Sequence, residues 1–164
     1  MSETLRRVVA ACLACIVAGC GFHLRGEPEV GIRKLFVSAN VPSQVAVEIR
    51  RALTAGPTRI VATAAEAEAH LRVLTESREK TVFTITTAGR VYEYQLKISV
   101  RYELVVPGRE EPVIPSNEIQ TRRLVTYSEA APTAKEAEEQ LLYKDMQVDL
   151  ARQILRHVAA KREL

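Results

Sequence analysis

Alternation of apolar and polar side chains is the strongest pattern in this chain, and it predicts a long β-strand. Every second residue from Tyr92 to Val106 is apolar, and up to Glu103 the residues between them are charged or polar. A period of two held over this length is typical of a strand with one buried and one solvated face, because a helix would scatter these residues around its circumference. An extended segment rich in Thr and Val precedes it at 71–87. We therefore expect a long hairpin that turns at 87–90.

Two other segments repeat apolar residues with the period of an α-helix. Pro42 and Ser43 open the first one, and Gly56-Pro57 provides a helix-stop signal after it. Its apolar stripe consists of Val45, Ile49 and Leu53. The second helix is long and is predicted to begin at Thr133, which can cap it, while Glu136 completes a capping box. Its core-facing stripe comprises Tyr143, Met146, Leu150, Ala151, Ile154 and Val158.

Shorter apolar runs at 34–39, 59–62 and 118–127 are interpreted as further strands, and 64–69 as one helical turn or a loop. The predicted order is strand, helix, several strands and helix. Two helices that cover one face of a mainly antiparallel sheet satisfy this order most simply, so the fold class is α+β. With 164 residues, the chain has the length of a single domain.

The N-terminus has the features of a lipoprotein signal peptide. Arg6 and Arg7 precede an uncharged apolar run from Val8 to Ala18. That run is too short for a membrane-spanning helix, which needs about 20 residues, but it fits the apolar region of a signal peptide. Small residues then precede Cys20, as at a lipoprotein processing site. An uncleaved signal anchor, or ordinary secretion with a coincidental cysteine, is the alternative.

The lipoprotein interpretation divides the chain into a cleaved signal peptide (1–19), a lipidated N-terminus and tether (20–33), and an α+β domain (34–164). All three cysteines, Cys12, Cys15 and Cys20, lie in the first 20 residues, so the folded domain contains no thiol. We expect Cys20 to carry covalent lipid as an N-acyl, S-diacylglycerol residue. Gly21 follows it, where Asp would retain a lipoprotein at the inner membrane in enterobacterial-type sorting, and this favours the outer membrane.

Composition and motifs argue against an enzyme and against a nucleic-acid partner. Hydrophobic residues make up 47% of the chain and charged residues 26%, with a net charge of only +3. The histidines His23, His70 and His157 are far apart, and no metal-binding or nucleophile motif occurs. We therefore expect no catalytic residue, no metal and no cofactor other than the lipid on Cys20.

Three cations are candidates for binding an anionic ligand. Arg90 is predicted at the hairpin turn and Arg109 at the turn after the following strand. Lys135 falls in the first turn of the last helix, where the helix dipole disfavours a cation. Each residue is either a solvated surface cation or a contact for an anion such as phosphate.

Several short motifs together resemble the LPS-assembly lipoprotein family LptE. The most specific is the run Gly19-Cys20-Gly21-Phe22-His23-Leu24-Arg25 around the predicted lipid site. The others are Glu93-Tyr94-Gln95-Leu96, Val106-Pro107-Gly108-Arg109, Ala134-Lys135 and Lys144-Asp145-Met146. The resemblance extends over essentially the whole chain after Gly19.

The resemblance implies two helices packed on one face of a mixed, mainly antiparallel four-stranded sheet. It also implies a lipid-anchored, periplasm-facing outer-membrane protein that plugs the LptD β-barrel and assists its assembly, so that lipopolysaccharide is inserted into the outer leaflet. Direct lipopolysaccharide binding is implied at Lys135, which matches a lysine of the family. The family's tip arginine aligns with Thr87, and the nearest cation is Arg90 beyond Gly89. The alternative is another periplasm-facing lipoprotein, such as an auxiliary subunit of a lipid transporter.

Overall fold

The computed structural model describes residues 30–128 and 130–161. Cys20, the predicted signal peptide and most of the predicted tether lie outside the described residues, so these assignments stay predictions. The elements in chain order are β1 (Lys34–Ala39), α2 (Gln44–Thr54), β2 (Arg59–Ile60), the 3-10 turn η1 (Ala64–Glu66), β3 (Ala69–Ile85), β4 (Val91–Val105), β5 (Ile114–Thr126) and α3 (Pro132–Ala160).

The sheet has five strands in the order β2-β1-β3-β4-β5, so the expected number of four is wrong. The additional strand is the short segment at 59–62, of which two residues pair in parallel with β1. Backbone bonds from Arg59 N–H to the Arg33 carbonyl (2.8 Å) and from Val61 N–H to the Leu35 carbonyl (3.1 Å) bring it into the sheet. β1 also runs parallel to β3, whereas β3, β4 and β5 are antiparallel. The sheet is therefore mixed and mainly antiparallel, as expected.

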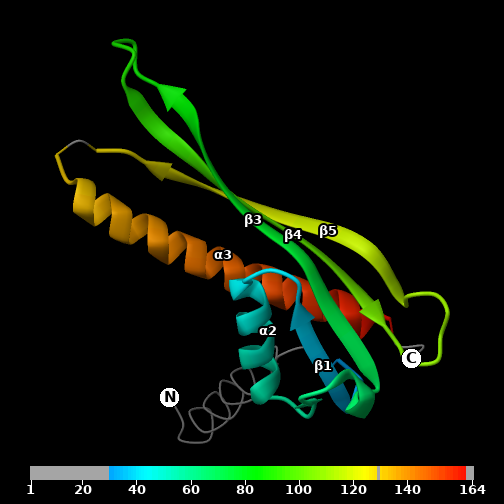
Figure 1. The fold of residues 1–164 in the computed structure, drawn as a ribbon. Coiled ribbons are helices and arrows are strands. Elements are labelled where there is room, and N and C mark those ends of the chain that lie inside the picture. Colours follow the sequence, from blue (N-terminus) through cyan, green and yellow to red (C-terminus); the bar gives the residue numbers. More distant parts are fainter. Residues whose placement is uncertain (1–29, 129, 162–164) are drawn as a thin grey trace, which may run out of the picture.

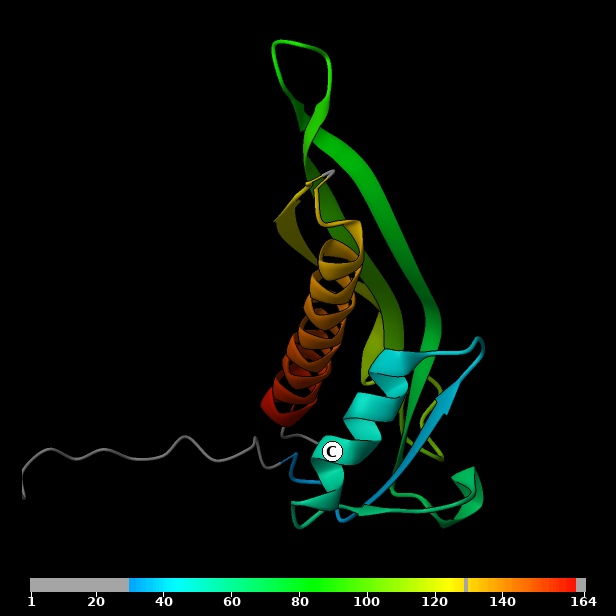
Figure 2. The same cartoon turned by 90° about the vertical axis from the view of Figure 1, so that its left-hand side faces the viewer.

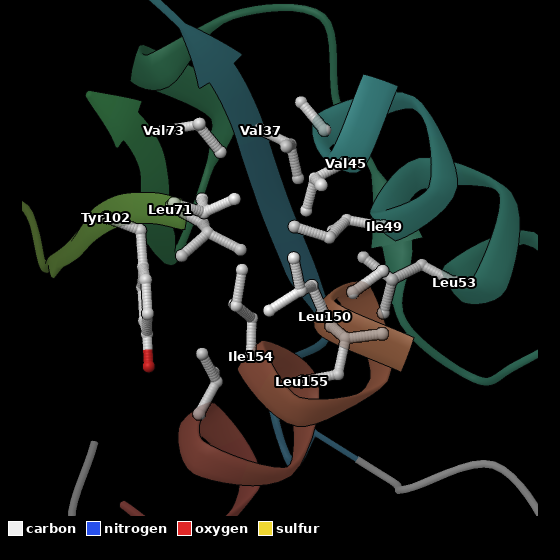
Figure 3. Close-up of a cluster of buried hydrophobic side chains, with 14 of the residues drawn as sticks. Val37, Val45, Ile49, Leu53, Leu71, Val73, Tyr102, Leu150, Ile154 and Leu155 are labelled. Atoms are coloured by element: carbon white, nitrogen blue, oxygen red, sulfur yellow. The ribbon is translucent and has the colours of Figure 1, made fainter. Parts of the chain in front are cut away.

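Both helices lie on the same face of the sheet, and the apolar core fills the space between the layers (Figures 1 and 2). In Figure 3, Val37, Leu71 and Val73 from the strands meet residues of α2 and α3. The predicted helix stripes are buried, which confirms their direction. On β4 the fully buried side chains are Leu96, Ile98, Val100, Tyr102 and Leu104. The alternation in the sequence thus identifies the core face of this strand.

Among the described residues, no helix lies on the opposite face of the sheet, and charged pairs connect neighbouring strands across that face. Lys97 of β4 lies 3.3 Å from Glu79 of β3, and Arg101 of β4 lies 3.1 Å from Glu118 of β5. Arg72 also pairs with Glu103. Exposed pairs of this kind contribute little each, about 0–1 kcal/mol, so the stability of the sheet comes mainly from the face that the helices cover.

The two helices begin differently, and only α2 begins as predicted. Ser43 caps α2, accepting a hydrogen bond from Ala46 N–H (3.0 Å), and Glu76 of β3 accepts from Val45 N–H (3.1 Å). The predicted capping box of α3 is wrong, because the helix begins at Pro132 and Ala131 is its N-cap, with no side-chain cap bond. Proline suits the first helical position because its fixed φ matches the helix and it has no N–H to satisfy.

The β3–β4 hairpin is longer than the helical layer. Its strands pair from His70 with Val105 as far as Ile85 with Val91. Figure 1 shows the end of the hairpin projecting past the start of α3. Tyr92, which shares the alternation of the buried residues, is consequently 53% exposed. The prediction of one buried face therefore holds only where a helix covers the strand.

Candidate functional site

The turn of the hairpin fixes the place of Arg90. Thr86 and Arg90 close it, with Thr86 N–H donating to the Arg90 carbonyl (2.7 Å) and Arg90 N–H donating to Thr86 Oγ1 (3.1 Å). Gly89 has a φ of +75°, in the left-handed region that residues with a Cβ rarely adopt. Arg90 is exposed and lies at the end of the hairpin, as the sequence predicts.

Large apolar side chains surround this end of the hairpin. They are Val82 (53% exposed), Phe83 (52%), Ile85 (63%) and Tyr92 (53%), and we call them the hairpin-end apolar residues. Single exposed apolar residues are normal, but a group of them marks a surface that contacts a partner or a lipid. Sequence reasoning missed this group because a strand pattern does not show which section of the strand lies beyond its covering helix.

Lys135 lies in the first turn of α3, as predicted, and has two partners there. Its Nζ donates to Thr126 Oγ1 of β5 (2.9 Å) and to Glu138 Oε2 (2.7 Å). The unfavourable position of this cation near the positive end of the helix is thus offset by a carboxylate three residues later on the same face. One quarter of the side chain remains exposed. Lys135 is therefore held in place and still open to solvent.

Beside Lys135 is a shallow hollow of about 110 Å³, which we call the α3 hollow. Its lining residues are Lys80, Tyr94, Val125, Thr126, Tyr127, Pro132, Lys135, Glu136 and Glu139. Strands β3, β4 and β5 and the first turns of α3 all contribute to it. It is a place where residues distant in the sequence come together, and pattern reasoning on each segment alone did not identify it.

A second lysine is fixed within the α3 hollow. Lys80 Nζ lies 2.5 Å from Glu139 Oε2 and 4.5 Å from the centre of the Tyr94 ring, where a cation is attracted by the aromatic face. The Tyr94 ring in turn packs edge to face against Tyr127, with 5.7 Å between the centroids. The hydrogen bond that Lys80 donates to the Glu139 carboxylate raises the pKa of Lys80 above its usual value. Lys80 therefore carries its positive charge throughout the physiological pH range.

The turn between β3 and β4, which carries Arg90, and the start of α3, which carries Lys135, lie toward the same end of the molecule (Figure 1), but Arg90 is not among the residues that line the α3 hollow. Tyr94 lines the hollow with Lys135 and follows Arg90 by four positions on β4, a distance of about 13 Å along a strand. Arg109, the third candidate, lies in the connection between β4 and β5, at the other end of the sheet.

Neither described histidine forms part of a metal-binding group. His70 Nε2 lies 2.7 Å from Ser38 Oγ, and its ring packs at a tilt against Phe36, while His157 Nδ1 lies 2.6 Å from the hydroxyl of the buried Tyr102. Within residues 30–128 and 130–161, no three His, Cys, Asp or Glu side chains are grouped so that they could hold a metal ion. The same residues include no helix with the length and apolar character required to cross a membrane.

Comparison with known proteins identifies the family. The protein-family model LptE, described as lipopolysaccharide-assembly, matches residues 32–158. Among curated proteins, the LPS-assembly lipoprotein LptE of Pectobacterium atrosepticum is 28% identical over 160 residues, covering 95% of this chain and 85% of the relative. The protein of the same name from Yersinia pestis is 29% identical over 147 residues, covering 87% and 70%.

Solved structures give the same result for the fold. The solution structure of an uncharacterized lipoprotein B from Nitrosomonas europaea is 30% identical, with a TM-score of 0.72, over 85% of this chain and 91% of that one. Rare lipoprotein B from Shewanella oneidensis is 27% identical, with a TM-score of 0.68, over 77% and 94%. The resemblance found in the sequence motifs is thereby confirmed, and this chain belongs to the LptE family of LPS-assembly lipoproteins, which is not a family of enzymes.

Proposed function

We propose that this protein is an outer-membrane lipoprotein that occupies the lumen of the LptD β-barrel and assists the assembly of that barrel, so that lipopolysaccharide is inserted into the outer leaflet. The observation that carries the proposal is the family match across residues 32–158, together with relatives named LPS-assembly lipoprotein over most of the chain. The α+β fold supports it by presenting a long hairpin and a long helix side by side, an elongated shape suited to a barrel interior (Figure 2).

The hairpin-end apolar residues are the surface that we assign to the barrel. Val82, Phe83, Ile85 and Tyr92 are more than half exposed in the part of the chain that the structure describes, toward the end of the hairpin that projects past the start of α3. Burying them against a partner would contribute about 25 cal/mol for each Å² of apolar surface removed from water.

The lipid on Cys20 would hold the protein at the periplasmic side of the outer membrane. A single acyl chain gives only marginal membrane binding, whereas two or more hold a protein durably at about 0.8 kcal/mol for each buried CH₂ group. A Cys20→Ser variant, which cannot receive the diacylglyceryl group, is therefore expected to appear in the soluble periplasmic fraction when cells are fractionated. Its retention in the outer membrane would show that the barrel alone anchors it.

Lys135 and Arg90 are the residues that we assign to lipopolysaccharide. Arg90 is in the turn between β3 and β4 and Lys135 is at the start of α3, two elements that lie toward the same end of the molecule (Figure 1). Lipopolysaccharide offers anionic phosphate groups that lysine and arginine bind well. Lys135 supplies a positioned charge at the rim of the α3 hollow, and Arg90 supplies a second one at the end of the hairpin. Lipid binding and barrel binding would then use neighbouring parts of one surface.

Affinity purification tests the central part of the proposal. The tagged full-length protein is isolated from outer membranes solubilised in a non-ionic detergent, and the co-purifying proteins are identified by mass spectrometry. We expect a large β-barrel protein in a stoichiometric amount. Recovery of the chain alone would contradict the proposal. Co-purification with an inner-membrane ATPase complex would instead identify an auxiliary subunit of a lipid transporter.

A further inference from the structure

The motif Phe22-His23-Leu24-Arg25 begins two residues after the predicted lipid site at Cys20 and is not used by the proposed function. It lies outside the described residues. Its two large apolar side chains, Phe22 and Leu24, are two positions apart, and residues with this spacing lie on the same side of an extended chain. The motif therefore offers a short apolar edge that gains free energy when a surface of the folded domain covers it.

A groove of about 280 Å³ lies between α2 and α3, and we call it the α2–α3 groove. It is more than twice as large as the α3 hollow. Its apolar lining comes from Ala52 and Ala55 of α2 and from Val148 and Ala151 of α3. Because these side chains are short, they leave space between the helices that a phenylalanine or leucine side chain can fill.

The rim of the groove carries a net positive charge. Arg51 and Arg152 lie on it with one acidic residue, Glu48, whose carboxylate pairs with Arg51 at 2.8 Å. Residues 21–29 contain one arginine and two glutamates, so their net charge is −1 with a neutral histidine. Two arginines and one glutamate give the groove +1. Opposite net charges favour docking of the segment, although each exposed pair contributes only about 0–1 kcal/mol.

The chain enters the described structure within reach of the groove. Val30, 3% exposed, is buried in the core that α2 and α3 share with the sheet. Three residues later, the Arg33 carbonyl accepts from Arg59 N–H at 2.8 Å. Ala55 of the groove precedes Arg59 by four residues, at most about 14 Å of chain. Phe22 precedes Val30 by eight residues, which span up to about 28 Å, so the segment is long enough to reach the groove.

A segment of the same chain suits this groove better than a separate protein does. Seven residues line the groove, whereas a stable interface between proteins engages about 20–30 residues on each side. A tethered segment needs much less contact, because a short linker keeps it at an effective concentration in the millimolar range.

We propose that Phe22 and Leu24 bind in the α2–α3 groove, so that the motif docks the N-terminus onto the folded domain. Cys20 precedes Phe22 by two residues, so docking places the predicted lipid within about 7 Å of the groove. The ten residues from Cys20 to Val30 otherwise allow a separation of up to about 35 Å. The docked motif fixes which end of the domain faces the membrane. This inference goes beyond the proposed function, since it concerns the anchor and does not require the barrel.

Disulfide trapping in the purified full-length protein, in non-ionic detergent, tests the docking. From residue 20 onwards, Cys20 is the only cysteine of the chain, and the predicted lipid blocks its thiol. Leu24→Cys is combined with Ala52→Cys in the groove. The matched control combines Leu24→Cys with Ala65→Cys, at an exposed residue of η1. Ala65 is three residues before Glu68, whose N–H donates to the carbonyl of the residue after Arg33 at 2.9 Å, so a free tether reaches it as well as the groove.

Under mild oxidation, we expect the pair with Ala52→Cys to close at least about fivefold faster than the pair with Ala65→Cys, because docking raises the local concentration of one thiol at the other. Mass spectrometry of the linked peptides confirms each disulfide. Equal rates would indicate a tether that samples both surfaces and would overturn the docking. His23→Cys with Ala52→Cys should close more slowly than Leu24→Cys does, since neighbouring side chains of an extended chain point to opposite sides. Equal rates in this comparison would overturn the assignment of Phe22 and Leu24 as the docked side chains.

Methyl NMR of the same preparation without the introduced cysteines gives an independent measurement. An aromatic ring in the groove changes the chemical shifts of the Val148 methyl groups, and Phe22→Leu removes the ring while keeping an apolar side chain. Val82, 53% exposed near the end of the hairpin, is the control position. We expect Phe22→Leu to shift the Val148 signals and to leave the Val82 signals in place. Unchanged Val148 signals would overturn the docking. Neither experiment contains barrel protein, so its failure is distinct from failure of the proposed function.

Discussion

Replacing Leu150 by alanine tests whether α3 is held on the sheet by its buried stripe. Leu150 is completely buried and lies in the core between α2 and the sheet, beside Leu53 and Ile154 (Figure 3). Leu→Ala substitutions at such sites cost about 2–5 kcal/mol, since the transfer free energy of the removed atoms is lost and a cavity is left. Two helices and a sheet meet at this point, so the cavity cannot close easily. We therefore expect Leu150→Ala to lower the free energy of unfolding by about 3–4 kcal/mol.

The same helix provides the control. Leu141 belongs to α3 as well but is 60% exposed, so Leu141→Ala should change the free energy of unfolding by less than about 0.5 kcal/mol. The assay is thermal unfolding followed by circular dichroism at 222 nm, with the protein in non-ionic detergent. For a domain of this size, we expect Leu150→Ala to lower Tm by about 10–15 °C. Similar changes for the two variants would refute the assignment of the buried face.

Three further substitutions test the turn, the lipid contact and the pH dependence. Gly89→Ala should lower the free energy of unfolding by about 1–2 kcal/mol, because φ is +75° at this position. Gly56→Ala is the control and should cost clearly less, because Gly56 has no positive φ. Equal costs for the two variants would argue against strain in the turn. Lys135→Glu should lower the affinity for lipopolysaccharide at least tenfold in a vesicle-binding assay, since the reversed charge also repels Glu138. An unchanged affinity would show that Lys135 does not contact the lipid. Burial lowers the pKa of His70, so the folded state binds the His70 proton less readily than the unfolded chain does. The neutral imidazole therefore favours the folded state at neutral pH, and this stabilisation is lost as pH falls through the lowered pKa. We expect the loss of stability between pH 7 and pH 5 to be smaller in His70→Gln; an unchanged pH profile would contradict this.

The sequence predicts the elements best where one local pattern determines which side chains are buried. The alternation on β4 identifies its buried side chains from Leu96 to Leu104, and the stripe on α3 identifies Met146, Leu150 and Ile154, because these residues meet a single continuous core. The pattern fails at Tyr92, since its periodicity says nothing about where the helical layer ends. The start of α3 also differs from the prediction, because the helix begins at Pro132, so Thr133 lies within its first turn and is not the N-cap.

The candidate site was harder to predict than the fold, because it depends on contacts between distant segments. Lys135 and Arg90 are visible as single cations from their positions in a helix and a turn. Lys80 is not, since within its strand it is one polar residue among many, and its role follows only from contacts with Glu139 and Tyr94. The local run at 59–62 predicts a strand, but the pattern does not say that two of its residues pair with β1 and extend the sheet to five strands.

Site-specific photo-crosslinking from the end of the hairpin tests the central claim most directly. A photo-reactive amino acid replaces Phe83, an exposed hairpin-end apolar residue, in the full-length protein in living cells. The account predicts a light-dependent adduct with the LptD barrel protein, recovered through a tag on this chain and mapped by mass spectrometry to residues that face the barrel lumen. Adducts with an inner-membrane complex, or with residues on the outer surface of the barrel, would contradict it.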